Sequence, residues 1–187
     1  MRRSVWRRRI GFPGRLQATL FVALLGIAGV VAMHPSAPAE TMTARAEAID
    51  GDTLRLASER VRLTGLDAPE LDQTCVDADG GEWRCGNEAR AFLAGLLASG
   101  TTACTISGRD TYSRALAHCS IAGDDLGGRI VSAGWAVADL GYAGEEAVAR
   151  DDRRGIWRGS FVSPAQWRRS HGNAPPVLWE WIRSWFQ

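Results

Sequence analysis

The sequence predicts an α+β domain that is rich in β-strand. Short runs such as residues 53–56 and 61–66 alternate apolar and polar side chains, which is the period of a half-buried strand. Three later segments are expected to be helices instead, the first of them with apolar residues at helical spacing. No segment repeats, so the 187 residues fit one domain of modest core with a segment at each end.

The first predicted strands flank a tight turn at the dipeptide Asp50-Gly51, which favours a hairpin connection. Residues 61–66 then form a further strand that ends at Asp67. Pro69 has no N–H group and a fixed φ, so strand pairing stops there and a loop begins. Acidic residues at the ends of these strands can therefore converge at one rim of the sheet.

The predicted helices are scaffold. Residues 89–98 carry apolar side chains along one helical stripe. Residues 126–137 predict a second helix that contains several glycines. Residues 144–154 predict a third, charged on most faces and ended by Gly155.

Residues 1–39 have the pattern of an export signal. Residues 1–15 are basic, residues 16–33 are apolar and uncharged, and Ala37-Pro38-Ala39 offers a cleavage site, as in a Sec-type signal peptide. The apolar run is also long enough to span a bilayer, so an uncleaved inner-membrane anchor is the alternative. Both interpretations place the remaining chain outside the cytoplasm, either periplasmic or secreted.

All four cysteines follow this signal, and an even number in an exported domain argues for disulfides. Of the three pairings, we expect Cys75 with Cys85, which bracket a polar loop rich in glycine. We expect Cys104 with Cys119 because they lie in apolar runs on either side of a turn. A zinc site is the competing use of cysteine, but the chain has no Cys-x-x-Cys pair and its three histidines are scattered.

Charge restricts how the chain can bind nucleic acid. All 22 basic residues are arginines, and six of them precede Ala39. From Glu40 onward, 16 arginines stand against 21 acidic residues, which gives a net charge near −5. Strong non-specific binding to duplex nucleic acid normally needs a basic surface. Any grip on such a substrate is therefore expected to be local to one site.

The candidate site is a run of acids interrupted by one arginine: Asp50, Asp52, Arg62, Asp67 and Glu70. Carboxylates can hold a hard cation through oxygen ligands while the guanidinium grips a phosphate. Each acidic turn alone is usually an ordinary solvated turn. Their occurrence together, with the arginine between them, points to a phosphodiesterase site.

These residues resemble the staphylococcal nuclease (thermonuclease) family from about Ala46 to about Trp157. The shared motifs are Asp-Gly-Asp-Thr at 50–53, Val-Arg-Leu at 61–63 with Leu-Asp-Ala-Pro-Glu at 66–70, Asp-Thr-Tyr-Ser-Arg at 110–114 and Arg-Gly-Ile-Trp at 154–157. The resemblance implies a five-stranded OB-fold barrel with three helices. It also implies a calcium-dependent endonuclease that hydrolyses phosphodiester bonds of DNA and/or RNA. We expect a monomer.

The resemblance further implies a calcium site. Asp52 and Asp67 match the family's calcium ligands, together with the main-chain carbonyl of Ala68. Many relatives have threonine at that last position, but alanine keeps the backbone oxygen. Glu70 matches the residue that positions or deprotonates the attacking water.

The resemblance assigns the phosphate to two arginines. Arg62 and Arg114 match residues that bind it and stabilise the charge that builds up on it. Tyr112 and Tyr142 match aromatic residues that contact the nucleotide. Leu140 stands where the founding member of the family has another tyrosine, so nucleobase stacking is expected to be weaker or placed differently.

A second function class stays open at this point. The acidic charge and Leu140 are compatible with a nuclease-fold binding or accessory module of the cell envelope, with weak activity or none. The complete set of site residues argues against it.

The C-terminal segment lies beyond the resemblance. After Pro175-Pro176, residues 177–186 are rich in tryptophan and have apolar residues at helical spacing. They could contact a membrane surface, a partner groove or the barrel itself. We therefore divide the chain into a signal or anchor at 1–39, a nuclease-like domain at 40–160 and an extension at 161–187.

Overall fold

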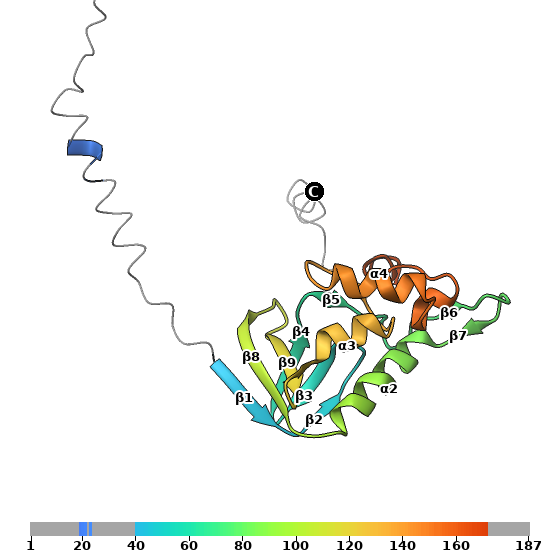
Figure 1. Ribbon diagram of the computed structural model, residues 1–187, viewed down its shortest axis with the longest axis horizontal. Helices are drawn as coiled ribbons and strands as arrows, with labels where there is room; N and C mark the ends of the chain where they lie inside the picture. The colour runs from blue at the N-terminus through green and yellow to red at the C-terminus, as the bar shows by residue number, and fades with distance from the viewer. Residues whose placement is uncertain (1–18, 22, 24–39, 172–187) are drawn as a thin grey trace, which may run out of the picture. The chain divides into compact units, whose positions relative to one another are not determined.

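The computed structural model describes residues 19–21, 23 and 40–171 (Figure 1). The chain divides into two compact units, Met1–Pro38 and Ala39–Gln187. In the first unit the four described residues are helical. Most of the expected export signal and all of residues 177–186 lie outside the described residues. Within the described ranges, no helix is long and apolar enough to cross a membrane.

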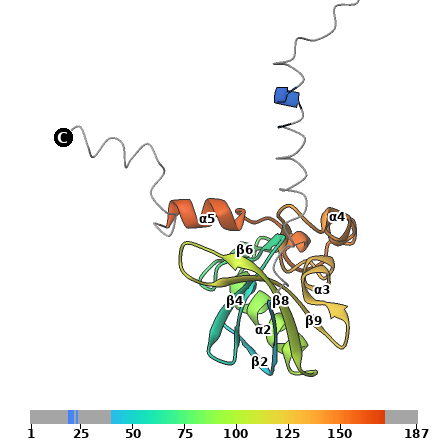
Figure 2. The ribbon, with the colours of Figure 1, turned by 90° about the vertical axis from the view of Figure 1, so that its left-hand side faces the viewer.

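The second unit is built on a curled mixed sheet (Figure 2). Within residues 40–171 this sheet has seven strands in the order β1-β8-β9-β4-β3-β2, with β10 added to β9. Strands β4 and β9 pair in parallel and the other pairs are antiparallel. The bounds are β1 (Glu40–Ala44), β2 (Ala46–Ala48), β3 (Thr53–Leu56), β4 (Glu59–Leu63), β8 (Thr102–Arg109), β9 (Ala115–Ile121) and β10 (Asp124–Asp125). The α+β fold of OB type is confirmed.

The turn between β2 and β3 forms at Asp50 and Gly51, as the sequence predicts. Oδ1 of Asp50 accepts hydrogen bonds from the backbone N–H groups of Asp52 at 3.0 Å and Thr53 at 2.6 Å. A Cβ atom added at Gly51 would lie 2.7 Å from the Cβ of Ala68. Glycine therefore lets this turn pack directly against the segment that follows Asp67.

The three predicted helices are present with shifted ends. They are α2 (Cys85–Leu97), α3 (Leu126–Ser132) and α4 (Ala143–Asp151), followed by the short 3-10 helix η1 (Gly155–Arg158). Helix α2 begins four residues earlier than expected, directly at the cysteine. Helix α3 ends at Ser132, ahead of Gly134, whose φ of +79° suits a left-handed turn.

A fourth helix, α5 (Pro164–Ser170), was not expected from the sequence. Its N-cap is Ser163, whose hydroxyl accepts a hydrogen bond from the backbone N–H of Gln166 at 3.3 Å. Proline at the first helical position has no N–H group to leave unpaired. Figure 2 shows α5 lying across one end of the curled sheet.

The main core lies between the sheet and helices α2 and α3. Its fully buried side chains include Leu54 and Val61 from the sheet, Leu93 from α2 and Ile130 from α3. A smaller cluster gathers Cys75, Cys85 and Ile156, with Trp83, Trp157 and Phe161 packed against it. Trp157 is thus a packing residue.

Two small sheets complete the domain. Strand β5 (Leu66–Asp67) pairs with β11 (Val137–Ala138), and β6 (Cys75–Val76) pairs with β7 (Glu82–Trp83).

Both expected disulfides are confirmed. Cys104 and Cys119 are directly opposite one another on β8 and β9, and they are bonded. Cys75 is bonded to Cys85. The Cys75–Cys85 disulfide links the first turn of α2 to the segment that follows Glu70.

Candidate active site

A pocket of about 370 Å³ collects most of the predicted site residues. The predicted residues that line it are Asp50, Asp52, Arg62, Ala68, Glu70, Tyr112 and Arg114. They come from the β2–β3 turn, strand β4, the segment after β5, and the β8–β9 turn. Asp67 does not line the pocket itself, but its carboxylate pairs with Arg62, which does.

Asp52 is the most deeply buried acid of the site, with 4 % of its surface exposed. Oδ1 accepts from the Thr53 hydroxyl at 2.9 Å, and Oδ2 accepts from the Ala68 N–H at 3.3 Å. Burial raises the pKa of Asp52 to about 7, although Arg62 acts in the opposite direction. A carboxylate in such a place is stabilised by an added cation.

Arg62 joins the two predicted calcium ligands. Its Nη2 lies 2.9 Å from Asp52 Oδ2 and 2.8 Å from Asp67 Oδ1. Burial alone would lower the pKa of Arg62, but the two carboxylates outweigh burial and raise it. The guanidinium is thus permanently charged and fixed at the junction of β4 and β5.

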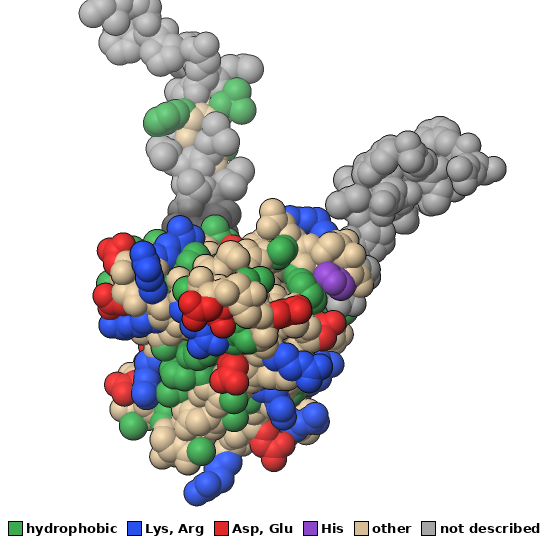
Figure 3. Space-filling view, turned by 90° about the vertical axis from the view of Figure 1, so that its right-hand side faces the viewer, with side chains coloured by type: hydrophobic (Ala, Val, Ile, Leu, Met, Phe, Trp, Pro, Cys, Tyr) green, Lys and Arg blue, Asp and Glu red, His purple; other side chains and the backbone are tan. Residues whose placement is uncertain are grey.

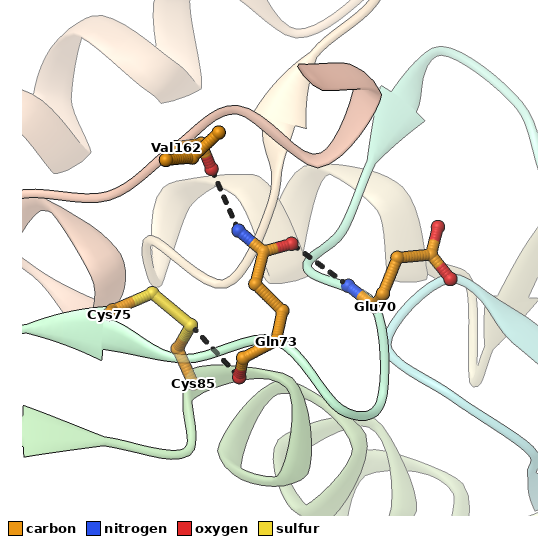
Figure 4. Close-up of a disulfide and its surroundings, with 5 residues drawn as sticks. All are labelled: Glu70, Gln73, Cys75, Cys85 and Val162. Carbon is orange, nitrogen blue, oxygen red and sulfur yellow. Dashed lines mark hydrogen bonds between the residues drawn. A yellow bond between two sulfur atoms is a disulfide. The ribbon is translucent and has the colours of Figure 1, made fainter. Parts of the chain in front are cut away.

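Glu70 is held by its backbone while its side chain faces the pocket. Its N–H donates to Oε1 of Gln73 at 3.2 Å (Figure 4). Its carbonyl accepts from the Gln73 N–H at 2.8 Å. The start of α2 closes on the same loop, since a Cβ added at Gly86 would lie 1.7 Å from the Glu70 carbonyl oxygen. Only glycine permits this approach.

Arg114 is positioned by the turn that precedes β9. Its Nε donates to Asp110 Oδ2 at 2.7 Å, and its N–H donates to Asp110 Oδ1 at 2.9 Å. Its Nη1 reaches the Thr53 hydroxyl at 3.4 Å. Strands β4 and β9 pair in parallel with Arg62 opposite Leu116, so Arg114 precedes the partner of Arg62 by two residues, and both arginines line one pocket.

Tyr112 stands at the open side of the pocket, with 62 % of its surface exposed. The Arg114 guanidinium carbon lies 5.6 Å from the centre of its ring. An exposed aromatic face beside an arginine is a platform on which a nucleobase can stack.

Tyr142 lies elsewhere, in a hollow of about 530 Å³ that is also lined by Leu140 and Arg150. Its ring packs against Gly65 and Gly127. Burial and a hydrogen bond to Asp125 raise the pKa of its hydroxyl. The structure therefore does not bring Tyr142 into the pocket of Arg62, and its nucleotide contact remains a prediction.

Arg168 is a site residue that the sequence did not indicate. From α5 its Nη1 donates to Asp67 Oδ1 at 2.9 Å and to Glu70 Oε1 at 2.8 Å, and its Nη2 donates to Asp67 Oδ2 at 2.9 Å. Burial would lower the pKa of Arg168, but Asp67 and Glu70 together raise it. Ser163 and Pro164 are a helix-start signal that could have revealed α5, but not where the helix docks.

The donor set suits a hard cation. Two carboxylates, Asp52 and Asp67, and the carbonyl of Ala68 are the oxygen ligands that calcium prefers. Burial raises the pKa of Asp52 even though Arg62 pairs with it, so a further cation would stabilise the charged form of this carboxylate. In the described part of the chain, no group of three or more acidic, histidine or cysteine side chains stands ready to hold a metal. Arginines instead hold the oxygens of Asp52 and Asp67.

Residues 60–159 match the family described as staphylococcal nuclease homologue. The chain belongs to this family. The matched residues contain Arg62, Asp67, Ala68, Glu70 and Arg114. Family membership implies a nuclease-type hydrolase and a nucleic acid substrate, and the two disulfides suggest an extracellular or periplasmic protein.

Two relatives illustrate the range of the family. The succinoglycan biosynthesis protein ExoI of Rhizobium meliloti (strain 1021) is 39 % identical over 139 residues, which cover 71 % of this chain and 73 % of that protein. The probable endonuclease LCL3 of Schizophyllum commune (strain H4-8 / FGSC 9210) is 30 % identical over 140 residues, covering 61 % of this chain and 46 % of that protein.

Proposed function

We propose that the protein is a calcium-dependent endonuclease that hydrolyses phosphodiester bonds of DNA and/or RNA outside the cytoplasm. The observation that carries the proposal is the pocket itself. It brings together two arginines, Arg62 and Arg114, with Glu70 and with oxygen donors of Asp52 and Ala68, a set that suits a phosphate and a calcium ion.

In this proposal Arg62 and Arg114 bind the scissile phosphate. Their guanidinium N–H groups donate to the phosphate oxygens and stabilise the negative charge that builds up during attack. Asp110 keeps Arg114 in place by holding its Nε and backbone N–H. Asp52 and Asp67 hold Arg62 through its terminal Nη1 and Nη2 atoms.

Glu70 orients the attacking water and takes its proton. Its backbone is fixed by Gln73, so the carboxylate is presented from a rigid loop. Calcium, held by Asp52, Asp67 and the Ala68 carbonyl, would supply further positive charge next to the phosphate.

The mixed surface charge favours a substrate that is held locally. On the face in Figure 3, Asp and Glu side chains are interspersed with arginines, and the arginines form no continuous basic area. Tyr112 offers its exposed ring to an unstacked base. We therefore propose single-stranded or locally opened nucleic acid as the preferred substrate. We also propose a monomer as the active form.

The location follows from residues 1–39, which we propose act as a cleaved signal peptide, with an inner-membrane anchor as the alternative. The Trp-rich stretch at 177–186 is proposed as a second element able to associate with a membrane. Residues 40–160 and 161–187 are proposed as the nuclease-like domain and its extension.

The substitution Glu70→Gln tests the proposal. It keeps the size of the side chain and removes its ability to take a proton, so hydrolysis of a single-stranded oligonucleotide should fall by about 10²- to 10⁴-fold. Glu82→Gln, on the exposed strand β7, is the matched control and should retain wild-type rates. Equal rates in both variants would refute the role of Glu70.

A second candidate is an accessory module of the cell envelope with weak activity or none. It is favoured by the relative named as a succinoglycan biosynthesis protein and by Arg168, which holds both Asp67 and Glu70. Under this candidate the folded protein would bind oligonucleotides at every calcium concentration without cleaving them.

A further inference from the structure

Arg168 brings a positive charge into the candidate active site from beyond the residues that define the family. The family match ends at residue 159, whereas α5 begins at Pro164. The guanidinium donates to both oxygens of Asp67 and to one oxygen of Glu70, at 2.8–2.9 Å. The contact spans 101 residues of sequence from Arg168 to Asp67.

These are the atoms that a calcium ion at Asp67 would need. Oδ1 of Asp67 accepts from both Arg62 and Arg168, and Oδ2 accepts from Arg168. A guanidinium and a divalent cation on the same carboxylate repel each other. Calcium binding at Asp67 therefore favours departure of one guanidinium.

Arg168 is the one better able to leave. The two side chains are similarly exposed, 26 % for Arg168 and 21 % for Arg62. Arg168 extends from a surface helix, whereas Arg62 also pairs with Asp52, a nearly fully buried acid. Departure of Arg62 would break ion pairs with two nearly buried carboxylates, Asp52 and Asp67, and would remove a proposed phosphate ligand from the pocket. Departure of Arg168 would uncover Asp67 and Glu70 together.

We propose that Arg168 competes with calcium for Asp67 and thereby sets the calcium affinity of the site. The inference rests on the proposed function, because it takes Asp67 as a calcium ligand. While Arg168 occupies Asp67 it also holds Glu70, so the calcium ligand and the proposed base are released in one event. Calcium then acts on the proton acceptor as well as on the phosphate site.

The helix need not unfold for this exchange. Its approach is fixed by the hydrogen bond from Gln73 to the Val162 carbonyl and by the Ser163 cap. Rotation of the long arginine side chain into water is enough to free the carboxylates. If the paired state exceeds the free state about tenfold, the apparent Kd for calcium rises about tenfold.

Calorimetric titration of the full chain with calcium, disulfides intact, tests the competition. Arg168→Gln removes the charge that contacts the carboxylates, and Arg169→Gln removes the same charge from the adjacent, exposed position. We expect the calcium Kd to fall about tenfold in Arg168→Gln and to stay within about twofold of wild type in Arg169→Gln. Equal Kd values in the two variants would overturn the inference.

Thermal unfolding supplies a second readout that does not depend on activity. Without calcium, Arg168→Gln should unfold at a lower temperature than Arg169→Gln, because Asp67 and Glu70 lose a partner. Saturating calcium should raise the Tm of Arg168→Gln more than that of wild type. An equal rise in all three proteins would contradict the competition.

The two proposals fail in different ways. Calcium binding with equal Kd in wild type and Arg168→Gln overturns only the role of Arg168. Absence of calcium binding in all three folded proteins overturns the calcium site and the competition with it. Binding by Arg168→Gln where wild type binds none would support the competition in its strongest form.

Discussion

The side-chain amide of Gln73 donates a hydrogen bond to the backbone carbonyl of Val162 at 2.7 Å, across 89 residues of sequence (Figure 4). Gln73 is fully buried, and its other amide atom, Oε1, accepts from the Glu70 N–H. The Sγ atom of Cys85 lies 3.5 Å from the Gln73 carbonyl oxygen. One buried side chain thus links the Glu70 loop to the segment that leads into α5.

Replacing this side chain should loosen both elements. Gln73→Leu keeps a similar volume but leaves the Val162 carbonyl and the Glu70 N–H without a protein partner. We expect a loss of about 2–4 kcal/mol in the free energy of unfolding, measured with urea, and lower nuclease activity. Asp72→Asn, at the exposed neighbouring position, is the control. An unchanged free energy of unfolding in Gln73→Leu would show that these hydrogen bonds do not stabilise the protein.

The two disulfides should differ in their effect on activity. Removing either by paired alanine substitution should cost about 2–4 kcal/mol of stability. Loss of the Cys75–Cys85 bridge should also reduce hydrolysis well below the unfolding temperature, because this bridge restrains the chain after Glu70. Loss of Cys104–Cys119, which joins two core strands, should leave hydrolysis near wild type at that temperature. Equal activity losses would refute this division.

The Asp110–Arg114 pair should make part of the stability depend on pH. Burial would raise the pKa of Asp110, but hydrogen bonds from the Arg114 side chain and from backbone N–H groups outweigh burial and lower it below its ordinary value of 3.8. A lowered pKa means that the stabilisation is present above 3.8 and is lost as the pH falls through the folded-state value.

Asp110→Asn should therefore be less stable than wild type at pH 7, and the difference should shrink as the pH falls below 3.8. Unfolding by urea at a series of pH values measures it. The variant should also bind substrate more weakly at pH 7, since Arg114 loses its partner. A stability difference that stays constant with pH would contradict the charge-based explanation.

Substitution by alanine should affect substrate binding at Tyr112 and stability at Tyr142. Tyr112 is exposed, so its loss should change stability by less than about 0.5 kcal/mol. Its loss should raise KM for a single-stranded oligonucleotide about fivefold or more, because a stacked base is lost. Tyr142 packs against Gly65 and Gly127, so its loss should cost about 2 kcal/mol of stability. Steady-state kinetics and urea unfolding of both variants decide between the two roles.

Local chemistry made much of the fold predictable. The Asp50-Gly51 turn and the helical stripe in α2 are set by neighbouring residues, and both are present. The strand expected over 61–66 is instead divided at Gly65, whose φ is +83°, into β4 and β5 of two different sheets. The disulfides followed from where the cysteines lie relative to expected strands and loops, and both pairings are confirmed. The predicted helix ends were less accurate. Helix α3 ends at Ser132 because Gly134 has a left-handed φ, which the spacing of apolar residues does not reveal.

The part of the site that could not be predicted from the sequence depends on contacts between segments that are far apart in the chain. Arg168 has no local feature that distinguishes it from Arg169, and only the docking of α5 directs it to Asp67 and Glu70. That docking depends in turn on Gln73, whose partner lies far along the chain. Tyr142 is the opposite case, a residue that the resemblance indicated but that the structure places outside the pocket of Arg62. Matching a family motif did not reveal that its ring packs against Gly65 and Gly127.

The most direct test of the proposed nuclease is the initial rate of single-stranded DNA hydrolysis by the wild-type protein with its disulfides intact. The rate is measured with calcium, then with excess chelator, and again after calcium is restored. We expect cleavage that stops with the chelator and returns with calcium. No cleavage by a folded protein that binds calcium would contradict the nuclease proposal and favour the accessory module.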